Sequence, residues 1–171
     1  AAAQGLLAGI NAARRATGKE PWYPLRHEAY IGVMVDDLVT LGTGEPYRMF
    51  TSRAEHRLLL REDNADRRLT PAARALGLID EQRWSRFSAK QEAIAACSAE
   101  LDTRFVLPGT PEAEAISTHV GKPLSREYRL SELLKRPELD HATLSRVCAL
   151  PVVGMDVAEQ VEIEAKYAGY I

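Results

Sequence analysis

The alternation of apolar and polar residues predicts a mainly helical chain. Within a helix expected over 28–41, one stripe consists of Ile31, Met34, Val35 and Leu38. After residue 80 a longer apolar seam recurs at a/d-like spacing, and it contains Trp84, Phe87, Ile94 and Leu101. Such stripes are typical of helices that pack one apolar face against neighbours. We therefore expect the C-terminal part of the chain to form a bundle-like helical array.

Residues that begin and end helices divide this pattern into segments. An Ala-rich helix is expected over 1–17, with Gly18 at its C-terminal end. Thr110 and Asp140 are N-cap signals for two later helices. A last helix is expected to begin near Met155 and to continue to the end of the sequence.

The region between residues 45 and 71 is harder to assign. Residues 47–50 are compatible with a short strand, which leaves a short β-hairpin open for the N-terminal part. Ser52 and Glu55 have capping-box spacing and would open a short helix. Thr70 before Pro71 predicts the start of another helix.

These signals place a domain boundary near Thr70. We expect residues 1–69 to connect to a domain outside this sequence, and residues 70–171 to form a self-contained helical domain. The sequence begins inside a helix without an N-cap residue and ends in a helix without a C-cap. Both ends favour a segment of a longer protein.

Composition limits the classes of function. The chain has 171 residues, 22 basic and 24 acidic, with a net charge of −2, so any nucleic-acid contact must use a local basic face. Its apolar runs are too short to span a bilayer. Cys97 and Cys148 have the apolar surroundings of buried thiols in a reducing compartment. The histidine spacing indicates no metal site, and no G-x-G-x-x-G follows a strand. We expect a cytoplasmic location and no membrane partner.

Arginines are concentrated in residues 47–68, hereafter called the arginine segment. Six arginines and four acids lie between Tyr47 and Arg68. Arg53, Arg57 and Arg61 recur every four residues, so either a helix or a strand would aim them in one direction. Guanidinium groups in such an array suit phosphate or carboxylate. The alternative is a salt-bridged surface in which the acids neutralise the arginines.

Four segments, in order along the chain, resemble the MnmG (GidA) family. They are AAAQGLLAGINAA (1–13), EAYIGVMVDDLVTLGT (28–43), EPYRMFTSRAEHRLLLREDNADRRLT (45–70) and VEIEAKYAGYI (161–171). This family is the FAD-dependent half of the enzyme that forms 5-carboxymethylaminomethyl groups on the wobble uridine of tRNA. The resemblance is weakest between about residues 105 and 153.

The resemblance implies that residues 1–69 are the tail of an FAD-binding domain with a connecting arginine segment, and residues 70–171 a C-terminal helical domain. It implies that Gln4 contacts FAD. The residues that it implies for RNA contact are Arg48, Arg53, Arg57, Arg61, Asn64 and Arg68. The parent would use NAD(P)H as reductant, pair with a GTPase and form a homodimer. No catalytic residue is expected in this chain, since the family's catalytic cysteines and dinucleotide motifs lie outside the matched segments.

Two other classes compete with this interpretation. One is a stand-alone helical interaction module without enzymatic connection. The other is an oligomerisation domain that uses the Trp84 seam and the final helix as interfaces. The Ala-rich first helix discriminates against the interaction module, which has no need of a small-residue helix that begins without a cap.

Overall fold

The computed structural model describes residues 1–42, 44 and 46–170. The ends of three family-like segments, at Thr43, Glu45 and Ile171, lie outside these described residues. The chain divides into two compact units, Ala1–Ala73 and Arg74–Ile171, hereafter unit 1 and unit 2. The sequence placed the boundary near Thr70.

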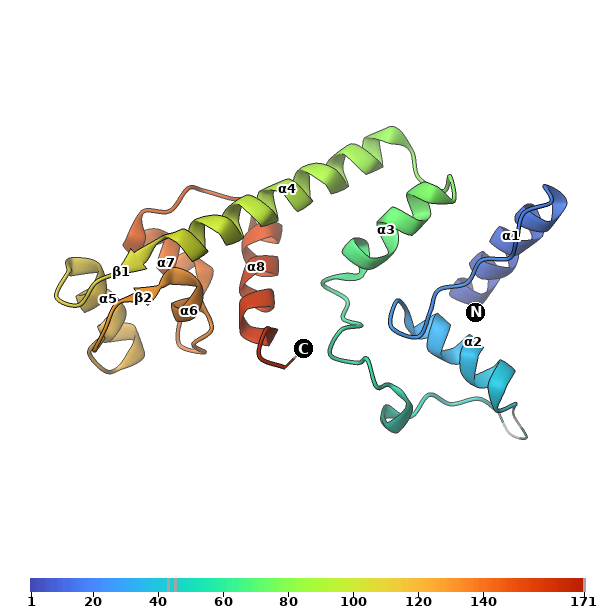
Figure 1. Ribbon diagram of the computed structural model, residues 1–171, viewed down its shortest axis with the longest axis horizontal. Helices are drawn as coiled ribbons and strands as arrows, with labels where there is room; N and C mark the ends of the chain where they lie inside the picture. The colour runs from blue at the N-terminus through green and yellow to red at the C-terminus, as the bar shows by residue number, and fades with distance from the viewer. Residues whose placement is uncertain (43, 45, 171) are drawn as a thin grey trace. The chain divides into compact units, whose positions relative to one another are not determined.

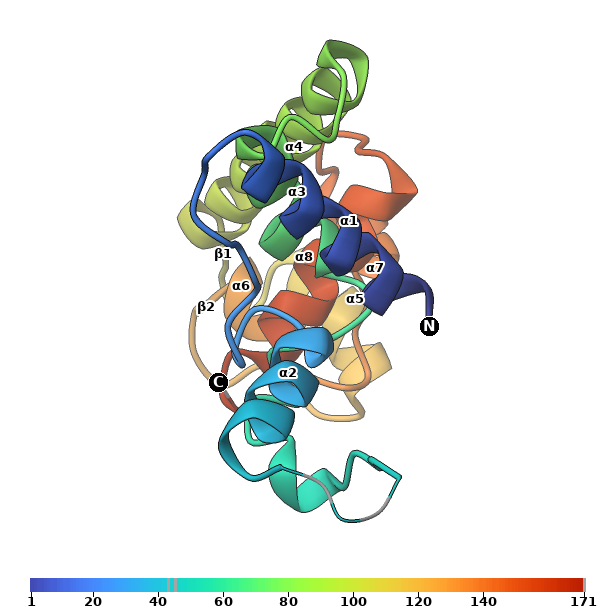
Figure 2. The ribbon, with the colours of Figure 1, turned by 90° about the vertical axis from the view of Figure 1, so that its right-hand side faces the viewer.

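Unit 1 contains little regular structure. Its elements are α1 (Ala2–Ala16), α2 (Tyr30–Thr40), the 3-10 turn η1 (Thr51–Arg53) and the greater part of α3 (Ala65–Ala75). The first two agree with the helices expected over 1–17 and 28–41, and Figure 2 shows them joined by an extended loop. That loop passes close to α2 at Gly32, where a Cβ would lie 2.4 Å from the carbonyl oxygens of Pro24 and Leu25. Only glycine fits there.

Unit 2 is the helical array that the sequence predicted. Its elements are α4 (Glu81–Thr103), β1 (Phe105–Val106), α5 (Pro111–Val120), β2 (Tyr128–Arg129), α6 (Leu130–Leu134), α7 (His141–Cys148) and α8 (Met155–Tyr167). Thr110 and Asp140 cap α5 and α7 as expected, accepting hydrogen bonds from the backbone amides of Ala113 and Thr143. The N-terminal half of α4 extends beyond the other elements of the unit (Figure 1).

A leucine-rich core holds unit 2 together. Helix α4 packs against α6 and α8, and α5 packs against α7. The largest fully buried side chains of the unit are Leu101, Ile116, Leu130, Leu133, Leu134, Leu139 and Leu144. Cys97 and Cys148 are buried free thiols, as the sequence predicted. Of the predicted Trp84 seam, Ile94 and Leu101 reach this core, whereas Trp84 and Phe87 are only half-buried.

The strand expected at residues 47–50 is wrong. Described residues 46–50 form no strand, and the antiparallel pair of the structure lies in unit 2. There Phe105 pairs with Arg129, and Val106 with Tyr128. Each strand has only two residues, too few for an alternating pattern to predict it.

Two predicted helix starts are also wrong. The 3-10 turn η1 begins after Phe50 rather than at a Ser52 capping box, and the Glu55 carboxylate is bound by Arg26 instead. Helix α3 begins at Ala65, directly after the Asp63–Asn64 turn, so Pro71 lies inside it. The last helix begins at Met155 as predicted and ends at Tyr167.

Replacing Leu144 by alanine should lower the free energy of unfolding of unit 2 by about 2–5 kcal/mol, because its fully buried side chain would leave a cavity. Urea unfolding followed by circular dichroism measures the change. Val152→Ala is the control, since Val152 is 98% exposed and should shift stability by less than about 0.5 kcal/mol. Equal effects would contradict this account of the core.

Candidate nucleic-acid interface

The arginine segment folds irregularly. Between α2 and α3 the only helical element of the described residues is η1, so Arg53, Arg57 and Arg61 do not share a helix or strand face. The four-residue spacing therefore does not by itself aim them in one direction, contrary to the sequence-based expectation. The position of each guanidinium is set by its own contacts.

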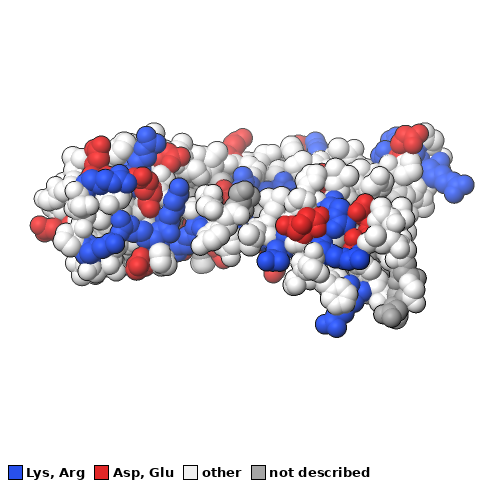
Figure 3. All heavy atoms as spheres, turned by 60° about the horizontal axis from the view of Figure 1, so that its bottom comes forward, with Lys and Arg blue, Asp and Glu red and all other residues white. Residues whose placement is uncertain are grey.

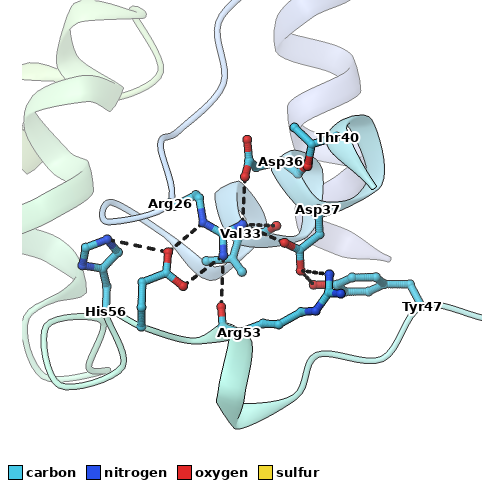
Figure 4. A network of polar contacts seen from close by, with 9 residues as sticks. Arg26, Val33, Asp36, Asp37, Thr40, Tyr47, Arg53 and His56 are labelled. Atoms are coloured by element: carbon cyan, nitrogen blue, oxygen red, sulfur yellow. Dashed lines mark hydrogen bonds and ion pairs between the residues drawn. The ribbon is translucent and has the colours of Figure 1, made fainter. Parts of the chain in front are cut away.

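Arg26 is the centre of a polar network in unit 1 (Figure 4). Its Nε and Nη2 donate to both carboxylate oxygens of Glu55, at 2.7 and 3.0 Å. Its Nη1 donates to Asp37 at 2.7 Å and to Asp36 at 2.9 Å. Its Nη2 also donates to the carbonyl oxygen of Arg53 at 3.1 Å. One side chain thus joins the end of the α1–α2 loop, α2 and the arginine segment.

Asp37 is the buried member of this network. Tyr47 donates its hydroxyl to Asp37 Oδ2 at 2.9 Å, and Arg53 Nη1 lies 3.7 Å from the same oxygen. Desolvation alone would raise the pKa of Asp37, but hydrogen bonds from Arg26 and Tyr47 and the nearby cations outweigh it, and the pKa is lowered. The Asp37 carboxylate is therefore ionised, and its oxygens accept hydrogen bonds from Arg26 and Tyr47. The sequence favoured solvation or a pair with a nearby arginine over an acid–base role for Asp36 and Asp37, and the structure shows the pair with Arg26.

The pKa values of the other members follow from the same contacts. The hydrogen bond from Arg26 lowers the pKa of Glu55 from 4.5 to about 2. Hydrogen bonds to Glu55 and then Asp37 raise the pKa of Arg26. Burial, followed by Asp37, raises the pKa of Tyr47. These groups keep one protonation state near neutral pH, which is the behaviour of a structural network rather than of acid–base catalysts.

Asn64 and Arg68 hold the other end of the arginine segment. Arg68 Nε donates to Asn64 Oδ1 at 2.8 Å, and its Nη2 donates to the carbonyl oxygen of Arg61 at 2.9 Å. Its Nη1 donates to the carbonyl oxygen of Glu28. The Asn64 amide in turn donates to the carbonyl oxygen of Leu59 at 2.9 Å. Desolvation lowers the pKa of Arg68. Asn64 and Arg68, both predicted to contact RNA, thus donate hydrogen bonds to backbone carbonyl oxygens of the protein itself.

The remaining predicted contacts differ in exposure. Arg61 is largely buried, with Nε 2.9 Å from Asp63 and Nη1 donating to the Leu58 carbonyl oxygen at 2.7 Å. Arg57 is exposed and reaches only the carbonyl oxygen of Thr51, at 3.4 Å.

Arg48 is exposed too, with its guanidinium 5.8 Å from the centroid of the exposed Phe50 ring. Arg53 retains a half-exposed side chain beside Asp37. RNA contact by these residues stays a prediction.

Gln4, the predicted FAD contact, lies on exposed α1, with its amide nitrogen 3.7 Å from the sulfur of Met34. FAD binding there also stays a prediction. Arg26 was not singled out from the sequence; the only signal was that two adjacent carboxylates needed a cation. The described residues contain no group of three metal-binding side chains and no helix able to cross a membrane.

Comparison with known proteins finds similarity over both the helical array and the arginine segment. Residues 81–171 match the family described as the tRNA modifying enzyme MnmG/GidA C-terminal helical domain. Aquifex aeolicus GidA is similar over 98% of the chain, at 38% identity, in two crystal forms with TM-scores of 0.82 and 0.79. The chain spans only 26% and 25% of those two structures.

Residues 81–171 thus have the fold of the C-terminal helical domain of a tRNA-modifying enzyme. Residues 1–80 precede this domain and lie outside the family match. The chain belongs to the MnmG/GidA family.

Acid should remove the contribution of Glu55 to stability. Its folded pKa is below its unfolded value of 4.5, so the contribution is present above that pH and is lost as pH falls toward about 2. Comparison of the free energy of unfolding of the chain and of Glu55→Gln across this range measures it. Near neutral pH the contribution of this exposed pair should be small, because solvent screens it. A difference that grows on acidification would contradict the assignment.

The 171-residue chain should bind no FAD, because a flavin site requires a glycine-rich turn and a helix N-terminus that hold the pyrophosphate. Flavin absorbance of the purified chain, and flavin released on denaturation, provide the measurement. Stoichiometric release would show that Gln4 and its surroundings suffice.

Proposed function

We propose that the chain is a C-terminal portion of an FAD-dependent enzyme that forms 5-carboxymethylaminomethyluridine at the tRNA wobble position. The observation that carries the proposal is membership in the MnmG/GidA family, with 38% identity to Aquifex aeolicus GidA over 98% of the chain. The parent enzyme would bind FAD, use NAD(P)H as reductant, form a homodimer and act in the cytoplasm. The chain itself supplies docking rather than chemistry.

Unit 1 supports a role in tRNA docking. Arg48, Arg53 and Arg57 have exposed side chains close together in sequence, and guanidinium groups bind phosphate well. The Arg26 network fixes the backbone of this segment through Glu55 and the Arg53 carbonyl. A fixed backbone lowers the entropy that would be lost when the exposed arginines bind a phosphate chain.

Unit 2 supports a role in binding the partner GTPase. An apolar groove is lined in part by Ala93, Ala96, Leu150 and Val153. Near it in sequence, Val152 and Met155 are 98% and 84% exposed. Exposed apolar side chains beside a groove are typical of protein–protein interfaces.

The proposal separates two kinds of arginine. Arg57→Ala should weaken tRNA binding and make the dependence of log Kd on log salt shallower by about one, because one phosphate contact is lost. Its melting temperature should be nearly unchanged, since Arg57 is exposed. Fluorescence anisotropy with a labelled tRNA transcript, together with thermal unfolding, measures both quantities.

Arg61→Ala is the matched control. Its loss removes the contacts with Asp63 and the Leu58 carbonyl and should lower stability by about 1–3 kcal/mol, while the salt slope stays parental. If Arg57→Ala also retains the parental slope and affinity, the arginine segment is structural and its proposed role in tRNA docking is wrong.

A further inference from the structure

The two-stranded ribbon β1–β2 of unit 2 carries stacked arginine–aromatic pairs. The guanidinium carbons of Arg126 and Arg136 lie 4.2 and 5.1 Å from the centroid of the Tyr128 ring. That of Arg129 lies 5.4 Å from the centroid of Phe105, its partner across the ribbon. Three guanidinium groups thus lie over the two aromatic rings of this four-residue ribbon.

These groups are accessible and mostly unneutralised. Phe105 is 49% exposed, and the Arg126 side chain 60%. Within the described part of unit 2, no carboxylate lies at ion-pair distance from Arg129 or Arg136, and Arg126 has only Glu132, at 3.5 Å. A half-exposed ion pair of that length contributes little. Glu132 also accepts a hydrogen bond from the Arg129 backbone amide at 3.1 Å, so one carboxylate faces two of the three cations and a net positive charge remains for a ligand.

The surrounding sequence is locally basic although the chain has a net charge of −2. Residues 122–136 contain five basic and two acidic side chains. Figure 3 shows Lys and Arg side chains gathered over the face of unit 2 that it presents, with single acidic side chains among them. A hydrogen bond with Ser125, and then the charges of Arg126 and Arg136, lower the pKa of Tyr128. The ribbon is a local basic face of the kind that a nearly neutral chain requires for RNA contact.

We propose that the β1–β2 ribbon binds unpaired RNA, with Arg126, Arg129 and Arg136 contacting phosphates and the exposed Phe105 ring stacking on a base. This inference rests on the proposed function, in which the chain docks tRNA, and it assigns a site in the stretch where the family resemblance is weakest. Arginine interleaved with aromatic rings is the pattern of surfaces that bind single strands.

Unpaired RNA is favoured over an acidic protein because of Phe105. An acidic peptide would use the cations but has no base to cover an exposed ring, whereas every nucleobase presents a flat face. Paired RNA keeps its bases stacked inside the helix, so only loops or ends offer such a face. The tRNA anticodon loop and 3′ end meet this requirement.

The test uses the full 171-residue chain and a labelled single-stranded oligouridine of about 12 nucleotides, within the range of known single-strand sites. Fluorescence anisotropy over a salt series from about 50 to about 200 mM gives affinity and salt slope. The variants are Phe105→Leu, Arg126→Ala, Arg129→Ala and Arg136→Ala. Arg86→Ala is the control, since it removes the same charge from an exposed position about 25 Å along α4 from the ribbon.

Each ribbon arginine variant should weaken binding at low salt and make the salt slope shallower by about 0.7, the value for one contact with a single strand. Phe105→Leu should weaken binding at least about fivefold with the slope unchanged, because stacking carries no counterion release. Arg86→Ala should bind as the parent chain does. Circular dichroism checks folding, and Arg126 and Arg129, which are exposed, keep the test valid if the half-buried Arg136→Ala variant unfolds.

Parental affinity and slope in all four ribbon variants would overturn the proposal. So would equal affinity for poly-glutamate of matched charge, because that result indicates an acidic protein partner. If Arg57→Ala weakens tRNA binding while the ribbon variants do not, the ribbon assignment fails and the proposed function survives. The reverse result supports the ribbon and removes the arginine segment from the RNA site. A chain that binds neither RNA overturns both.

Discussion

The guanidinium of Arg26 is the interaction on which unit 1 depends. This unit buries few large apolar side chains, so hydrophobic packing cannot by itself fix the segment between α2 and α3. Arg26 joins that segment to α2 through Glu55 and Asp37. Removing it would leave the Asp37 carboxylate, only 4% exposed, with the Tyr47 hydroxyl and the longer 3.7 Å contact to Arg53, and a buried charge that loses its main partner is destabilising.

The same chemistry divides the arginines of the chain into two groups. Guanidinium groups that donate to backbone carbonyls, as Arg68 does, replace the missing hydrogen bonds of an irregular backbone. Others lie over aromatic rings at the surface, as Arg129 lies over the exposed Phe105. A count of arginines in the sequence cannot separate the groups, because both types lie in basic stretches. Exposure and the identity of the acceptor separate them.

The helices of unit 2, but not its two short strands, could be predicted from the sequence, and unit 1 only in part. The helices of unit 2 begin at local signals such as Thr110 and Asp140, whose side chains cap the amides three residues later. The arginine segment instead depends on contacts between distant residues, such as Arg26 with Glu55 and Arg68 with Glu28. No periodic pattern encodes such pairs, so spacing arguments misplaced the strand, the capping box and the start of α3. For the same reason, the sequence identified Asn64 and Arg68 as notable residues but not what they bind.

The two units also differ in what they require to be stable. Unit 2 has a closed core whose leucines are fully buried. Unit 1 instead exposes large apolar side chains on and beside its helices, among them Leu6, Tyr23, Val39 and Leu41. An apolar surface of this extent is costly in water and normally covered. Unit 1 therefore gains less stability from apolar burial than unit 2 does. Its polar network, rather than an apolar core, fixes the arginine segment.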